Sequence, residues 1–133
     1  MMRLLHDRTG AEIATAVTLA DTRASRRRGL LGRDSMEEGE ALMLSPCGAI
    51  HTFFMRFAID VIFVDKDGCV VRTVSRMRPW RLAAAWRART VIELPAGRLE
   101  ALARGSAAGS GEHAVNVGDQ VYVAPVREER RAS

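Results

Sequence analysis

The clearest pattern along the chain is an alternation of apolar and polar residues across positions 51–64. The odd-numbered positions after His51 are all apolar, whereas the even-numbered positions include Thr52 and Asp60. A period of two places successive side chains on opposite faces of an extended chain, so one face of this segment is predicted to enter a core. Because strands rarely exceed about ten residues, we expect a bend or bulge near residues 57–58 that splits the segment in two.

Shorter apolar runs, separated by turn residues, predict further strands along the rest of the chain. The expected strands cover residues 4–6, 11 onward, 16–20, 41–44, 69–74, 91–94 and 120–123. The first two form an opening hairpin around the turn Asp7–Gly10. Asp65–Gly68 is a strong turn signal and is expected to join the 51–64 segment to strand 69–74 in another hairpin.

Two short segments have helical character. The first is predicted to run from Arg23 to Leu31, with Asp21 or Thr22 as its N-cap and Gly32 just beyond its end. Residues 98–104 predict a second short helix, followed by a glycine-rich surface insertion over 105–111. Many short strands and few helices favour a mainly β domain, a compact β-sandwich or barrel-like fold with one or two short helices.

Length and composition add boundaries to this prediction. A chain of 133 residues fits one domain over 1–133, with a core at about 12–125 and a charged tail over 126–133. No apolar run approaches the roughly 20 residues of a membrane helix, and the N-terminus does not resemble a secretory signal. We therefore expect a cytoplasmic protein without a membrane span, a monomer or weak oligomer. Cys47 and Cys69 lack metal-ligand spacing and are expected to be free thiols, buried as small hydrophobes.

The net charge of +4 is carried almost entirely by arginine, because Lys66 is the only lysine among 20 basic residues. A basic surface over residues 23–33 or 76–89 is compatible with nucleic-acid binding, and this is one alternative function. However, the chain has no zinc-finger spacing, aromatic-rich RNA-binding motif or clear helix-turn-helix pattern. Nucleic acid is therefore not the expected partner.

Five polar residues interrupt stretches in which burial would favour a hydrophobic side chain, and buried polar groups need partners. They are Arg33, His51, Thr52, Asp60 and Glu93. In a structural interpretation, Asp60 and Glu93 accept hydrogen bonds from backbone N–H groups at bends, and Arg33 neutralises one of them. In a functional interpretation, the five residues line a pocket that binds a small ligand.

Catalytic alternatives use the same residues. His51, Asp60 and Glu93 would supply an imidazole and two carboxylates to a divalent metal or an enzyme site, with Arg33 as an anion partner. His51 and Asp60 would face opposite sides of an unbroken strand, so this set requires the bend. A Cys47–His51 nucleophile pair has only proximity in its favour. No cofactor is predicted, and the leading hypothesis is a non-enzymatic accessory domain that binds a small ligand or a protein partner.

The sequence predicts a candidate contact surface between residues 78 and 89, where two tryptophans flank an alanine-rich stretch among several arginines. Tryptophan and arginine together are typical of contact surfaces. We expect any interaction surface to include Trp80, Arg81 and Trp86. His6 and His113 fall in segments that are predicted to be at the surface and suggest no chemistry.

Five motifs, in this order along the chain, resemble the DUF192 (UPF0127) family. They are Gly29–Arg33, His51–Phe57, Ile59–Asp65, Glu93–Gly97 and Val117–Asp119. The resemblance covers roughly residues 12–125. It implies a mainly β, sandwich-like fold with minor helices, and it implies no activity because the family has no established biochemical function.

Overall fold

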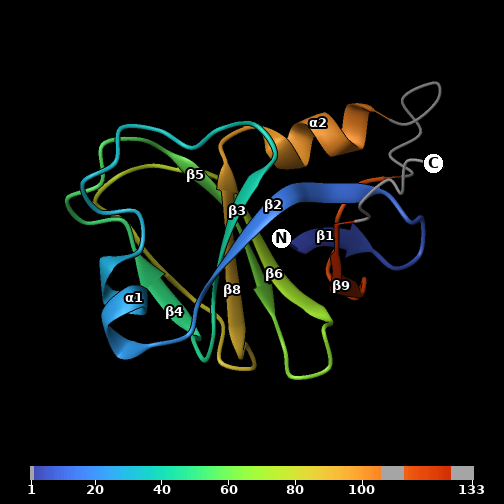
Figure 1. The fold of residues 1–133 in the computed structure, drawn as a ribbon, viewed down its shortest axis with the longest axis horizontal. Coiled ribbons are helices and arrows are strands. Elements are labelled where there is room, and N and C mark those ends of the chain that lie inside the picture. The colour runs from blue at the N-terminus through green and yellow to red at the C-terminus, as the bar shows by residue number, and fades with distance from the viewer. Residues whose placement is uncertain (1, 106–112, 127–133) are drawn as a thin grey trace, which may run out of the picture.

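The computed structural model describes residues 2–105 and 113–126, and within these ranges it contains nine strands and two short helices (Figure 1). The strands are β1 (Met2–His6), β2 (Glu12–Ala20), β3 (Glu40–Leu44), β4 (Ala49–His51), β5 (Ile59–Val64), β6 (Val70–Met77), β7 (Leu82–Ala84), β8 (Thr90–Pro95) and β9 (Val121–Pro125). The helices are α1 (Arg23–Arg28) and α2 (Arg98–Arg104). The predicted mainly β fold with two short helices is confirmed. Most of the predicted glycine-rich insertion and of the charged tail lies outside the described residues.

Seven strands form one curled sheet in the order β6-β5-β8-β3-β2-β1-β9, and β4 and β7 form a separate two-stranded sheet. Among the described strands, only β2 and β3 run parallel; the other neighbouring pairs are antiparallel. The curl brings the two ends of the large sheet together at one point. There Cys69 and Gln120 form an isolated antiparallel β-bridge, and the Val70 N–H donates to the Asp119 carbonyl at 2.7 Å. The large sheet is therefore a curled half-barrel.

Both faces of the large sheet are covered, and the core divides into two clusters accordingly. On one face, Leu99 and Leu102 of α2 pack with alternate residues of β5 and β8, such as Ile62 and Leu94. On the other face, Leu30, Ile50 and Met55 pack with the intervening residues, such as Val61, Phe63 and Val91. The prediction that one face of the 51–64 segment enters the core is confirmed for its second half, where the other face is buried as well, because all six residues of β5 are buried.

The predicted split of the 51–64 segment is present but involves more residues than a bend. β4 ends at His51 and β5 begins at Ile59, with turns between them. The chain leaves the strand path at Thr52, whose backbone N–H donates to the Arg81 carbonyl at 2.9 Å. Two residues later, Phe54 has a positive φ of 66°, which extended strands do not adopt.

The first helix is shorter than predicted. Thr22 is its N-cap, and its hydroxyl accepts the Ser25 N–H at 3.0 Å, as in a capping box. The helix ends at Arg28 because Gly29 takes a positive φ of 45°, so the predicted end at Leu31 is wrong. Leu30 can then turn into the core, where it is 3% exposed. The second helix has the predicted bounds.

Two compositional expectations can also be compared with the described residues. Cys47 and Cys69 are free thiols, although both are half-buried rather than buried. None of the described helices is long and apolar enough to span a bilayer.

Candidate functional site

Residues of α1, β3, β4 and β8, with the loops beside them, line a pocket of about 260 Å³. Figure 1 shows α1 and β4 next to each other at one side of the molecule. Its apolar lining comes from Leu30, Leu31, Leu44, Ala49, Ile50 and Met55. Its polar lining comes from Arg26, Arg27, Arg28, Cys47, His51 and Glu93. The pocket therefore combines an apolar wall, a basic side and one carboxyl group.

Glu93 is the buried polar group of this pocket. It lies in β8 between Leu42 of β3 and Val61 of β5, so its side chain shares a face with Val61. The residue is 4% exposed, and its Oε2 has no hydrogen-bond partner among the described residues. Burial raises the pKa of the Glu93 carboxyl to about 7. At neutral pH the group is present in both forms, so it can donate a hydrogen bond or accept one.

His51 and Cys47 lie at the edge of the same pocket. His51 is exposed; its Nδ1 accepts the Phe53 N–H at 3.3 Å, and its ring stacks on Phe53 with centroids 4.9 Å apart. The Cys47 Sγ donates to the Ala49 carbonyl at 3.1 Å. The structure therefore brings two of the predicted site residues, His51 and Glu93, to one cavity.

Asp60 lies on the opposite face of the sheet. Its Cα partner in β8 is Leu94, which belongs to the cluster under α2. Its carboxylate accepts three backbone N–H groups: Arg76 at 2.8 Å, Gly97 at 3.2 Å and Leu99 at 2.8 Å. Gly97 is the N-cap of α2 and has no side chain to cap the helix, so Asp60 caps it from β5.

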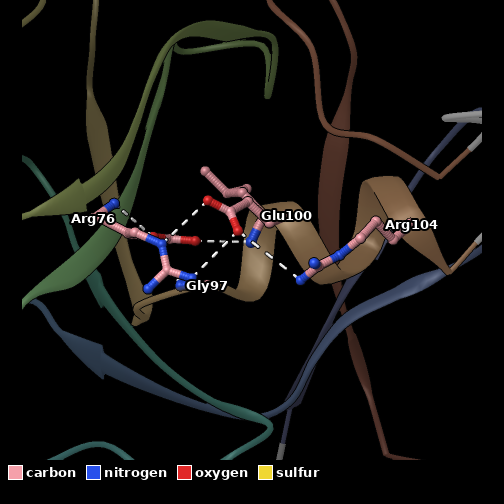
Figure 2. A network of polar contacts seen from close by, with 6 residues as sticks. Arg76, Gly97, Glu100 and Arg104 are labelled. Carbon is pink, nitrogen blue, oxygen red and sulfur yellow. Dashed lines mark hydrogen bonds and ion pairs between the residues drawn. The ribbon is translucent and has the colours of Figure 1, made fainter.

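The same corner carries a surface network around Arg76 (Figure 2). Arg76 sits in a bulge of β6 with a positive φ of 50°, opposite Asp60. Its guanidinium donates to both carboxylate oxygens of Glu100, at 3.1 and 3.2 Å, and Arg104 lies 3.9 Å from the same carboxylate. The hydrogen bonds from Arg76 lower the pKa of Glu100, and both side chains are exposed. The network adds to the attachment of α2 at its first turn.

Thr52 and Arg33 also have partners outside the pocket. Thr52 is fully buried; its hydroxyl donates to the Arg78 carbonyl at 2.6 Å and accepts the Arg81 N–H at 2.9 Å. Arg33 pairs with Glu40, with Nη2 and Oε2 2.9 Å apart. The prediction that Arg33 neutralises Asp60 or Glu93 is therefore wrong.

The predicted triad of His51, Asp60 and Glu93 is not assembled, because Asp60 and Glu93 point to opposite faces of the sheet. Within residues 2–105 and 113–126, no group of three His, Cys, Asp or Glu side chains is placed to hold a metal ion. The bend near residues 57–58 does not bring the two carboxylates together, since register in the sheet fixes their faces.

The residues of the predicted contact surface are exposed. Trp80 is 56% exposed and Trp86 is 91% exposed, and Arg81 is exposed as well. Trp80 packs on Phe54, with ring centroids 4.6 Å apart, whereas Trp86 lies under the Arg87 guanidinium. The two tryptophans thus have different neighbours, and their role in an interaction stays a prediction.

Sequence reasoning missed two features of these regions. It gave the arginines of α1 no role beside Glu93, because nothing local relates positions so far apart in the chain. It also placed His6 at the surface, but His6 is fully buried and its Nε2 lies 2.9 Å from Oδ2 of Asp119. A histidine at the end of an apolar strand is the only available signal.

Comparison with known proteins identifies relatives over most of the chain. The sequence profile of DUF192, described as "Uncharacterized ACR, COG1430", matches residues 5–109. A UPF0127 protein of Thermococcus sibiricus is 34% identical over 105 residues, which are 74% of this chain and 68% of that protein. A UPF0127 protein of Pyrococcus furiosus is 33% identical over 105 residues, covering 74% of this chain and 88% of the relative.

Two crystal structures have a similar fold at 20% sequence identity. A Sinorhizobium meliloti protein, named a "putative transcription regulator", has a TM-score of 0.71 over 92% of this chain and 91% of its own. A protein of unknown function from Novosphingobium aromaticivorans has a TM-score of 0.66 over 91% of this chain and 82% of its own. At this identity the likeness concerns the fold.

Proposed function

Since the chain belongs to the DUF192 family of uncharacterised proteins, we propose a function from its own pocket: it is a non-enzymatic domain that binds a small ligand beside Glu93. The observation that carries the proposal is the buried Oε2 of Glu93, which has no partner among the described residues. An unpartnered buried carboxyl group is costly to the fold. A ligand that hydrogen-bonds to Glu93 would remove this cost and gain affinity from it.

The lining defines the chemical class of the ligand. Leu30, Leu44, Ile50 and Met55 offer an apolar wall to a hydrocarbon or aromatic body. The arginines of α1 favour an anionic group on the same molecule, because a guanidinium pairs well with a carboxylate or phosphate. We expect a small amphipathic anion with a polar group that reaches Glu93.

Met55 provides a direct test, because it lines the pocket and is 7% exposed. Protein labelled with ¹³C at the methionine methyl groups is titrated with short aliphatic and aromatic carboxylates, some with an amide or hydroxyl group at the far end. We expect the Met55 signal to shift for the members with both polar ends, while the signal of Met77, which does not line this pocket, stays in place. If no carboxylate of the panel moves Met55, the proposal is wrong.

Two variants connect the signal to Glu93. Glu93→Leu removes the polar contact and should weaken binding about tenfold or more, whereas Glu93→Gln keeps a hydrogen-bonding group and should weaken it less. Equal affinity in wild type and Glu93→Leu would contradict the role of Glu93.

A second candidate, acid–base catalysis, is favoured by one observation: Glu93, with its raised pKa, and His51 line the same cavity. Mass spectrometry of the ligand after incubation separates the two functions. A ligand recovered unchanged supports binding, and one chemically altered in wild type but not in Glu93→Gln supports catalysis.

A further inference from the structure

β6 is an edge strand of the large sheet. It pairs along its length with β5, and among the described residues only its first part meets the other end of the sheet, through Val70. Along the rest of the strand, every second residue directs its backbone N–H and C=O groups away from β5. Such an edge is a template for another extended chain.

A groove of about 400 Å³ runs along β6 and is closed on its other side by β7 and the residues before it. Its lining includes Arg72, Arg78, Arg81, Met77 and Leu82, and none of its lining residues is acidic. Arg72 crosses from one strand to the other, with its Nη1 donating to the Ala84 carbonyl at 2.7 Å. The groove therefore follows the strand edge and has a basic lining.

The positive charge of this groove is only partly neutralised. Arg76 is paired with Glu100, as described above. Arg78 and Arg81 are exposed, and neither forms an ion pair with a carboxylate of the described residues. An anionic ligand in the groove would meet two guanidinium groups that have no carboxylate partner among the described residues.

Exposed apolar surface lies beside these arginines. Leu82 lines the groove and is 71% exposed, and the neighbouring Trp80 packs on Phe54, which is 72% exposed. Trp80 and Phe54 both have a positive φ, 65° and 66°, and Thr52 holds their two loops together. Strained backbone persists only where the surroundings enforce it, so these side chains are displayed on a rigid support.

We propose that this groove binds an acidic peptide segment in an extended conformation, which adds as a strand to the free edge of β6. Its acidic side chains meet Arg78 and Arg81, and its apolar side chains of the same face pack on Leu82. The charge alone would also suit a nucleic acid. The strand edge decides for a peptide, because a polynucleotide cannot match the alternating N–H and C=O groups of β6.

The test uses a fluorescein-labelled peptide in which glutamate and valine alternate along every second position and threonine fills the positions between, so that one strand face carries both residue types. Phenylalanine or leucine replaces valine in parallel probes, and fluorescence anisotropy is the readout. The matched control peptide carries N-methyl groups on alternate amides, which leaves the charges intact and blocks strand pairing. We expect N-methylation to weaken binding about tenfold or more. The ¹³C-methyl signal of Met77 should shift with the unmethylated peptide, while that of Met55 should not.

The matched protein variants are Arg78→Glu/Arg81→Glu and, as a control outside the groove, Arg87→Glu/Arg89→Glu. Both variants change the net charge equally, and a thermal melt verifies their folding. The groove variant should lose about tenfold or more in affinity, and the control should lose much less. The proposal is overturned if none of the peptides binds, if the N-methylated peptide binds equally well, or if oligo-dT binds to this groove in preference to the peptides.

Discussion

Asp60 and Glu93 lie on neighbouring strands, β5 and β8, and both are buried, but their carboxyl groups have opposite environments. Asp60 accepts three backbone N–H groups and anchors α2, whereas Oε2 of Glu93 has no partner among the described residues. Burial alone therefore does not distinguish a structural carboxylate from a candidate binding group. The partners do, because a satisfied group stabilises the fold and an unsatisfied one costs stability.

The largest effect is expected from Asp60→Ala. The substitution leaves the N–H groups of Arg76, Gly97 and Leu99 without their acceptor, and it removes the cap of α2. We expect a loss of about 3–5 kcal/mol in the free energy of unfolding, measured by urea denaturation. The free energy of unfolding of Asp60→Asn should lie between those of the wild type and Asp60→Ala. A loss below about 1 kcal/mol for the alanine variant would break the contrast with Glu93.

A carboxylate that is paired in the folded state loses its stabilising contribution as pH falls. The contribution of Glu93 to stability should change with pH in the opposite direction. Its pKa is about 7 in the folded chain and, at about 4.5, lower in the unfolded chain, so the folded state binds more protons between these values. Stability is then fully present below about pH 4.5 and is lost as pH rises through about 7. The loss is about 3–4 kcal/mol, since the two pKa values differ by about 2.5 and each unit of pKa difference is equivalent to about 1.4 kcal/mol.

The difference in stability between wild type and Glu93→Gln isolates this contribution from the other acids. Denaturant melts are measured from pH 4 to 8, roughly the window set by the two pKa values. The free energy of unfolding of the wild type should fall relative to that of the variant as pH rises. A difference that does not change with pH would mean that Glu93 is paired in solution.

Thr52→Val tests whether a neutral, satisfied group behaves like Asp60. The substitution keeps the shape of the side chain but removes the hydroxyl that binds Arg78 and Arg81. We expect a loss of about 1–2 kcal/mol, smaller than for Asp60→Ala because the hydrogen bonds involve no charge. Urea denaturation measures the loss, and an unchanged midpoint would show that the two loops hold together without it.

The smallest effect is expected from Glu100→Gln. Its ion pairs with Arg76 and Arg104 are exposed, and exposed pairs contribute little after screening by solvent and salt. The thermal midpoint should move less than for Thr52→Val, with no dependence on added salt beyond that of wild type. A shift as large as that of Asp60→Ala would mean that this surface network, and not the backbone hydrogen bonds of Asp60, holds α2 in place.

Much of the fold could be predicted because its signals are local. The turn Asp65–Gly68, the apolar strand 59–64 and the helical segment 98–104 each depend on neighbouring residues, and each appears near its predicted position. Gly29 shows the limit even of local signals, since a helix can end at either of two glycines and the sequence does not say which.

The candidate site was less accessible to sequence reasoning. Odd or even position in the sequence shows which residues of one strand share a face, but it could not relate Asp60 to Glu93. These two residues lie on different strands, and whether they share a face depends on the register between β5 and β8. The pocket also requires α1, which is close to β8 only after the sheet has formed. The polar residues were found because each interrupts an apolar motif, but their partners are set by tertiary structure.

The capping of α2 by Asp60 also bears on the order of events in folding. A helix of seven residues is far too short to persist alone in water, and its cap resides on a strand almost forty residues earlier. The carboxylate faces the first turn of α2 only when β5 and β8 have paired with Asp60 opposite Leu94, because α2 directly follows β8. We therefore expect helix α2 to form late in folding, so that its docking reports that the pairing of β5 with β8 has already reached its native register.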